Sequence, residues 1–291
     1  MGMRQDVKMQ FARLSVLEKL LAINIVFFIL PIFINTVLFL FSFSVQERSE
    51  IISGLMSYFE LSSNFKTAIL RPWTFLSYGF FHGSLRHLIM NMIILYLSGS
   101  LLLNLFSRRL LLNTFFMGIF SGAVIYLISY NIFPVFSNVT GRMIGSSAGV
   151  IAVLVFMASY NPNALIRILI FSVPLKYIAL VFIFLDLALI PEGNAGGHIA
   201  HLGGALWGYV YQRQFLQGND IGGWFMNTYE ALKKSLKGTP KSKRPKRRAK
   251  TPASNAVDQK KIDAILDKIA SSGYESLTKA EKEYLFRAGK Q

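Results

Sequence analysis

The chain has 291 residues, of which 53% are hydrophobic, and its mean hydropathy is +0.43. This hydropathy is too high for an ordinary soluble domain and indicates a polytopic membrane protein. The formal net charge is +16 and there is no cysteine, so disulfides are excluded and the outer loops need another source of rigidity.

Six apolar segments are candidates for membrane spans, because about 20 apolar residues cross a hydrocarbon core. They cover residues 20–43, 85–106, 110–132, 147–160, 175–190 and 197–215. The first begins about twenty residues into the chain and lacks a small-residue cleavage site, so we expect an anchor rather than a cleaved signal peptide. The predicted fold class is an all-α bundle of six transmembrane helices.

Basic residues gather on one side of these spans. They precede the first span, separate the second from the third and the fourth from the fifth, and crowd the tail between Lys233 and Lys250, while the opposite loops carry only Arg48, Lys66, Arg71, Arg86 and Arg142. This bias predicts that both termini are cytoplasmic and that the tail lies near anionic lipid. A nucleic-acid surface is the alternative for the tail, but no other feature supports it, so we expect the bilayer as a partner and no nucleic acid.

The loop at residues 44–81 is long and ends in "RPWTFLSYGFFHGS", which is rich in aromatic residues. Aromatic side chains favour the membrane interface, where this loop could shield something beneath it. The second span then opens with "HGSLRHLIMN", in which His87 and Asn91 share one helical face. An imidazole N–H and an amide are suitable donors to an oxyanion. We expect His82 to tie the loop to the helix; the alternative for the group is an interfacial histidine cluster.

The fourth span is short. From Ser147 to "YNPN" there are about 14 residues, or about 21 Å of helix, against a hydrocarbon core of about 30 Å. Its first turn should therefore start below the outer surface, beside protein or a water-filled cavity. Residues Gly145 to Gly149 also fit the G-x-S-x-G pattern of serine nucleophiles, although small residues commonly just pack membrane helices together.

The last span contains "GHIAHLGGALWG", which places His201, Gly204 and Gly208 on one helical face. Glycines beside a histidine let a neighbouring backbone approach, so a serine and this imidazole could reach bonding distance. The alternative is a polar packing histidine. We expect His198, nearer the surface, to be structural. Asp186, the only acidic residue within a core span, is expected to bond near the outer end of its own helix rather than to orient His201.

The chain is expected to divide into three parts: a membrane body at residues 1–218, an extended basic linker at 219–256 and a helical module at 257–291. In the module, Ile262, Ile265, Leu266 and Ile269 fall on one face of a helix. Gly273 should end that helix, and Thr278 with Glu281 predicts a capping box at the start of the next. Helices this short are marginal alone, so we expect them to dock on a cytoplasmic protein partner.

Taken together, three motifs resemble the rhomboid family of intramembrane serine proteases, over roughly residues 10–215. They are H-x4-H-x3-N at His82, His87 and Asn91, G-x-S at Gly145 to Ser147, and A-H-x2-G-x3-G at Ala200, His201, Gly204 and Gly208. The pattern looks like a bacterial subgroup with a short C-terminal helical segment.

The resemblance implies a six-helix rhomboid bundle in a bacterial inner membrane, with a site that opens to the outer face and needs no cofactor or metal. Ser147 would be the nucleophile and His201 its base. Asn91, His87 and the backbone N–H of Ser147 would bind the oxyanion, with Gly145, Gly149, Gly204, Gly208 and His82 in supporting roles.

Three positions depart from the family pattern. Ala148 stands where glycine is common, Ile151 where many members have an aromatic residue that stacks on the histidine, and Thr74 follows Trp73 in place of arginine. The resemblance implies an endopeptidase acting on single-pass transmembrane substrates. A rhomboid-like protein that binds or moves clients without cutting them, and a transporter or channel, are the alternatives.

Overall fold

The computed structural model describes residues 12–168, 171–236 and 259–288. Within them, three helices are long and apolar enough to cross a membrane: α2 (Val16–Leu40), α6 (Leu85–Leu105) and α7 (Arg108–Ile132). A serine precedes each of these helices and accepts a hydrogen bond from the backbone N–H three residues on, so the sequence fixes where each begins.

Three shorter or less apolar helices follow: α8 (Ser147–Tyr160), α9 (Leu175–Leu189) and α10 (Ala195–Leu216). Their bounds and those of the three longer helices agree closely with the six predicted segments; the largest difference is at α2, which begins at Val16 rather than residue 20.

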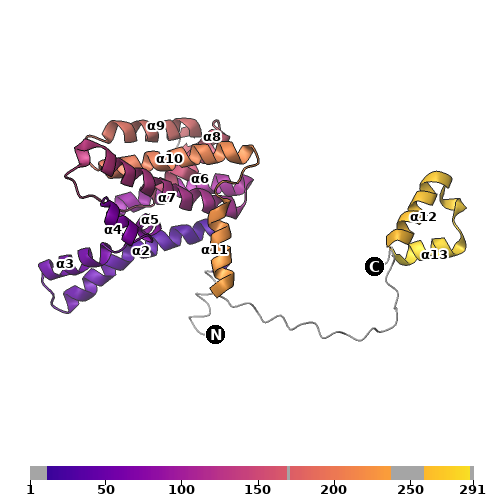
Figure 1. The fold of residues 1–291 in the computed structure, drawn as a ribbon, viewed down its shortest axis with the longest axis horizontal. Coiled ribbons are helices and arrows are strands. Elements are labelled where there is room, and N and C mark those ends of the chain that lie inside the picture. Colours follow the sequence, from indigo (N-terminus) through magenta and orange to yellow (C-terminus); the bar gives the residue numbers. More distant parts are fainter. Residues whose placement is uncertain (1–11, 169–170, 237–258, 289–291) are drawn as a thin grey trace. The chain divides into compact units, whose positions relative to one another are not determined.

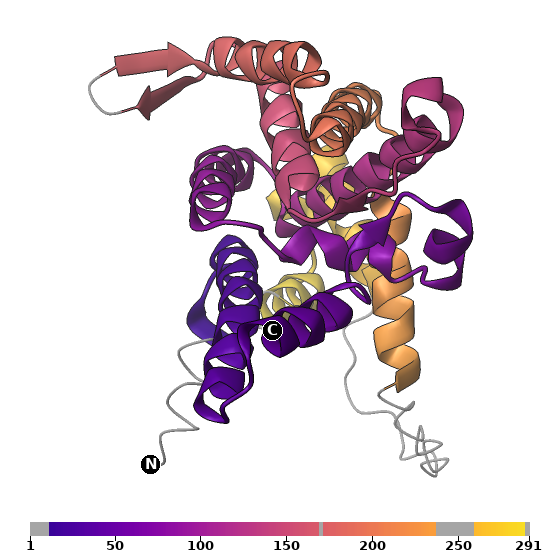
Figure 2. The ribbon, with the colours of Figure 1, turned by 90° about the vertical axis from the view of Figure 1, so that its left-hand side faces the viewer.

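The core is built around α8, which packs against α6, α7, α9 and α10 (Figures 1 and 2). Every side chain from Ser147 to Ala158 is buried. A helix that is buried and apolar all round belongs at the centre of a bundle. By contrast, α2 buries only Leu17, Leu20 and Asn24, so most of its apolar surface is left for lipid.

The segment between α2 and α6 is mostly helical, although the sequence suggested a loop. It forms α3 (Val45–Met56), α4 (Phe65–Leu70), α5 (Thr74–Ser77) and the 3-10 turn η1 (Tyr78–Phe80). Between α3 and α4, β1 (Leu61–Ser62) pairs antiparallel with β2 (Arg142–Met143), which follows the 3-10 turn η2 (Pro134–Phe136). This pairing fastens the segment to the chain that leads into α8.

A hairpin joins α8 to α9. Its strands, β3 (Leu165–Ile168) and β4 (Phe171–Pro174), pair antiparallel with Leu165 opposite Pro174, and the hairpin projects away from the helices (Figure 2).

The predicted linker at 219–256 needs correction, because its first part forms α11 (Gly223–Leu236). This helix packs on α7: Phe225 stacks on Phe116, and the guanidinium of Arg109 donates to Oδ1 of Asn227 over 2.7 Å. Aromatic residues at the start of α11 thus hold it against the bundle. Residues 237–258, which include the most basic run, lie outside the described residues.

Contacts divide the chain into two units, residues 1–236 and 237–291. In the second unit, α12 (Gln259–Ser272) ends at Gly273, whose φ is +79°, and a 3-10 turn (Tyr274–Ser276) leads to α13 (Lys279–Ala288). The predicted capping box is confirmed, since the backbone N–H of Thr278 donates to Oε2 of Glu281 and that of Glu281 to Oγ1 of Thr278. On the predicted apolar face, Ile265 is buried, whereas Leu266 is 49% exposed.

Glu281 makes this capping box sensitive to acid. The hydrogen bond from the backbone of Thr278, with that from Lys268, lowers the pKa of Glu281 to about 2 from 4.5. A carboxylate with a lowered pKa stabilises the folded state above about pH 4.5, and that contribution is lost as the pH falls towards 2. Hydrogen exchange of the intact chain should show protection of α13 falling over this range. In Glu281→Ala, which removes the acceptor, protection of α13 should already be lower than in the wild type at pH 6; equal protection in both proteins at pH 6 would contradict this account.

Candidate active site

Ser147 and His201 meet between α8 and α10. Oγ of Ser147 lies 2.6 Å from Nε2 of His201, within the range for a nucleophile and its base. Ser147 is the first residue of α8 and is 9% exposed. The first backbone N–H groups of a helix lack partners within it and favour negative charge. The structure therefore brings the predicted pair together at a helix N-terminus.

Small residues allow the close approach of α8 and α10. A Cβ atom on Gly204 would collide with the backbone oxygen of Ala148, and one on Gly208 with that of Ala152. Gly149 serves the other face of α8, where a Cβ would lie 2.6 Å from the backbone oxygen of Phe115 on α7. These glycines set the helix separation at which the imidazole reaches the hydroxyl.

Ala148, the departure from the family pattern next to the serine, is accommodated by a glycine on α7. It is buried, and a Cβ on Gly122 would lie 2.6 Å from its methyl group. The methyl group therefore fills space that a side chain at position 122 would otherwise need.

Gly145 has the backbone that the turn before α8 requires. Its φ of +129° is strained for any other residue, and a Cβ there would lie 2.7 Å from Cε1 of His87. The sequence pattern identified this glycine, and the structure supplies two separate reasons for it.

His82 links the loop before α6 to the start of α8. Its Nε2 lies 3.1 Å from Oγ of Ser146, so its partner directly precedes α8 and is not on α6, the helix that follows His82. Burial lowers the pKa of His82 to about 4, which leaves the ring neutral at pH 7. His82 thus holds the residue next to the nucleophile.

His87 and Asn91 lie one turn apart on α6, where Asn91 is buried and His87 lies against Gly145 in the turn before α8. His87 lines the same cavity as Ser147, and Asn91 is buried with Nδ2 lacking a hydrogen-bond partner among the described residues. A buried donor without a partner costs free energy, about 1–3 kcal/mol. Such a donor is suited to an oxyanion that forms only during a reaction.

A polar cavity of about 510 Å³ borders Ser147, His201 and His87, whereas Asn91 lies behind its lining residues. Its lining includes Ser147, His201, His87, Tyr126, Tyr130 and Arg142. Ser147 therefore borders open space on this side, although the rest of α8 is closely packed.

Asp186 contacts His201, contrary to the expectation that it would bond near the outer end of its own helix rather than orient that histidine. Its Oδ1 lies 2.8 Å from Nδ1 of His201 and 2.8 Å from Nδ1 of His198, both on α10. Sequence spacing could not reveal this contact, because it does not predict which side of α9 faces α10. The three side chains have donor atoms within 4.8 Å of one another, close enough for one divalent ion, although hydrogen bonds already join the carboxylate to each imidazole.

Tyr78 and Ser63 support the site and were missed in the sequence. The hydroxyl of Tyr78 donates to the backbone oxygen of Ile119, and its own backbone oxygen accepts from the N–H of Gly145 over 2.9 Å. Oγ of Ser63 accepts from the N–H of Gly141 over 2.8 Å. These contacts hold the irregular chain before α8. The aromatic run was a signal for Tyr78, and no sequence signal pointed to Ser63.

Comparison with known proteins gives two family matches. The model described as "Rhomboid domain" matches residues 70–218, which is more than half of the chain. The model described as "Family of unknown function (DUF6576)" matches residues 250–290.

Two relatives are similar over about half of this chain. "Presenilin-associated rhomboid-like protein A, mitochondrial" from Danio rerio is 32% identical over 166 residues, or 54% of this chain and 40% of its own length. "RHOMBOID-like protein 12, mitochondrial" from Arabidopsis thaliana is 29% identical over 165 residues, which are 52% of this chain and 48% of the length of that protein. The chain therefore spans less than half of the length of either relative. Both are named as mitochondrial proteins, so they give no support to the expected bacterial subgroup.

Proposed function

The chain belongs to the rhomboid family, and on that premise we propose that it is a serine endopeptidase that cleaves transmembrane proteins within the bilayer. The observation that carries the proposal is the 2.6 Å contact between Oγ of Ser147 and Nε2 of His201, beside a polar cavity. A packing serine or histidine would not require this pairing.

In the proposed reaction, His201 takes the proton from Ser147 as the hydroxyl attacks the scissile carbonyl. The resulting tetrahedral oxyanion accepts hydrogen bonds from Asn91, His87 and the backbone N–H of Ser147. His201 then gives its proton to the leaving amine, which departs and leaves an acyl-enzyme on Ser147. Water from the cavity, deprotonated by His201, hydrolyses this ester and restores the serine.

We propose that the substrates are single-pass transmembrane proteins that unwind near one membrane surface. A hydrogen-bonded helix hides its peptide bonds, so the cut segment needs small or helix-breaking residues. The charge bias supports six spans, with α8, α9 and α10 joining the three long helices, both termini on the cytoplasmic side and the cavity open to the other side. A bacterial inner membrane remains part of this proposal and rests on the subgroup pattern in the sequence alone.

The second candidate is a rhomboid-like protein that binds or moves membrane clients without cutting them. Residues 257–291 would bind a cytoplasmic protein under either function. A protein that does not cut has no need for a serine at position 147 or a histidine at position 201, and either residue could be replaced without loss of function. The contact between Ser147 and His201 therefore favours the protease.

The test is cleavage in liposomes that contain the purified chain and a single-pass substrate with a glycine-rich, helix-breaking segment near one surface. The proposal predicts that the wild type cleaves one peptide bond inside that segment and so yields two fragments. The Ser147→Ala protein should yield none. Equal cleavage by both proteins would overturn it, and binding without cleavage by the wild type would favour the second candidate.

Asn91→Ala is expected to lower kcat about 100- to 1000-fold, because it removes a donor needed most in the transition state. KM should change little, since the amide has no oxyanion to bind in the ground state. Steady-state kinetics in liposomes measure both constants. Leu97→Ala, further along the same helix, is the control for loss of α6 packing; an Asn91→Ala protein no slower than this control would refute the role of the amide.

A further inference from the structure

Asp186 lies on the buried face of a helix whose other faces are apolar and exposed. The buried positions of α9 are Leu175, Ala179 and Asp186, which share one side of the helix. Leu180, Val181, Phe184 and Leu187 are each more than half exposed, as expected for side chains in contact with lipid. A carboxylate on the inner side of such a helix is expensive unless it is paired, so it indicates a specific role.

The pairing of Asp186 fixes the proton positions on His201. An ionised carboxylate only accepts hydrogen bonds, so the 2.8 Å contacts require that His198 and His201 both donate from Nδ1. Protonation at Nδ1 leaves the lone pair of neutral His201 on Nε2, which is the atom that lies 2.6 Å from Oγ of Ser147. The carboxylate therefore selects the tautomer that can accept the serine proton.

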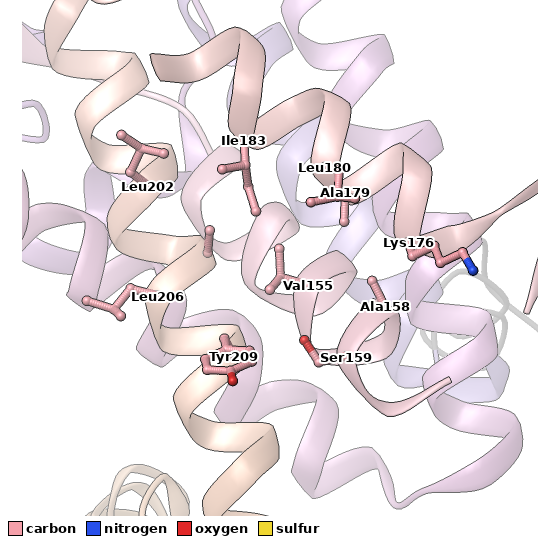
Figure 3. Close-up of a pocket in the computed structure, with 11 residues that line it drawn as sticks. Val155, Ala158, Ser159, Lys176, Ala179, Leu180, Ile183, Leu202, Leu206 and Tyr209 are labelled. Carbon is pink, nitrogen blue, oxygen red and sulfur yellow. The ribbon is translucent and has the colours of Figure 1, made fainter. Parts of the chain in front are cut away.

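The polar contact of Asp186 with His198 and His201 is confined to one end of the interface of α9 with α8 and α10. The adjacent part of this interface is apolar. An apolar cavity of about 450 Å³ lies between α8, α9 and α10, and its wall at this end is formed by Ile183, Leu202 and Leu206 (Figure 3). Elsewhere on α9, Ile178, Phe182 and Ile183 pack against the core and could hold the helix in place without a buried charge. Packing alone thus does not account for the carboxylate.

We propose that Asp186 is a positioning residue that makes Ser147, His201 and Asp186 a hydrogen-bonded triad. The inference rests on the proposed function, and it extends the serine–histidine pair by a group on a third helix. Asp186 touches neither substrate nor the reacting atoms. It acts through His201, by holding the ring orientation and by stabilising the imidazolium that forms when the serine proton is taken.

The test uses Asp186→Asn in the intact chain, with ¹⁵N-labelled histidine observed by NMR and cleavage measured in liposomes. Wild-type His201 should show the tautomer protonated at Nδ1. In Asp186→Asn, this tautomer should no longer dominate, and kcat should fall about 100-fold with KM within about twofold. The amide has nearly the same volume, so the substitution removes the charge and changes packing little.

Ile183→Ala is the matched control, because it loosens the packing of α9 one turn away and keeps the carboxylate. It should lower thermal stability while keeping the wild-type tautomer and a kcat within about threefold. The proposal is overturned if Asp186→Asn retains the Nδ1–H tautomer of His201, or if its kcat matches that of either the wild type or Ile183→Ala. A wild-type protein that shows the Nδ1–H tautomer but cleaves nothing would instead refute the proposed function and leave the hydrogen-bond assignment in place.

Discussion

Ser147→Ala is expected to lower substrate cleavage by at least about 1000-fold, the largest effect of any substitution proposed for this chain. The hydroxyl is the group that would form the covalent bond, and removing it leaves only the oxyanion donors and the binding of the substrate. The fold should persist, because the substitution removes only one oxygen atom and α8 is held in place by its other buried side chains. Cleavage of a single-pass substrate in liposomes, followed over hours, measures the effect.

Ser159→Ala is the matched control for this loss, because Ser159 lies near the opposite end of α8 and lines the apolar cavity rather than the polar one. Its activity should stay within about twofold of the wild type. Loss of activity in both variants would mean that α8 itself had been disturbed, and residual cleavage by Ser147→Ala at the wild-type rate would place the nucleophile elsewhere.

Gly204→Val is expected to lower activity at least about 100-fold, although residue 204 carries no reacting group. Any Cβ there would collide with the backbone oxygen of Ala148, the residue next to the nucleophile, and backbone cannot move aside as a flexible side chain can. The helices must separate, which lengthens the contact between Ser147 and His201. Overpacking of this kind also costs about 1–3 kcal/mol of stability.

Thermal unfolding and cleavage should be measured on this variant beside Gly54→Val. A Cβ on Gly54 meets no heavy atom within 4 Å, so that variant tests whether a valine in place of a helical glycine is harmful by itself. Gly54→Val should retain activity within about twofold. Full activity in Gly204→Val would show that the approach of α8 and α10 does not control the site.

The sequence was sufficient to predict features that depend on local spacing. Apolar runs predicted the helix bounds, and the shortness of the fourth span predicted that Ser147 lies at a buried helix start. The i, i+3, i+7 pattern put His201, Gly204 and Gly208 on one face, where the structure finds all three directed at α8. The capping box of Thr278 and Glu281 is local in the same sense.

Features that depend on how helices rotate and on contacts distant in the chain were not predicted. Asp186 and His201 lie on different helices, and no spacing rule states which side of α9 faces α10. The pairing of β1 with β2 joins residues about 80 positions apart, and the docking of α11 depends on aromatic contacts with α7. The departure at Ile151 left open how the imidazole is held, and the contact with Asp186 gives a physical answer.

The most direct measurement is covalent labelling of the intact, folded chain in lipid with a fluorophosphonate, followed by mass spectrometry to locate the modified residue. A serine activated by an adjacent imidazole should react, so the account predicts modification of Ser147 in the wild type and its absence in His201→Ala. An unmodified Ser147 in a folded wild-type protein, or equal labelling of Ser147 without His201, would contradict it.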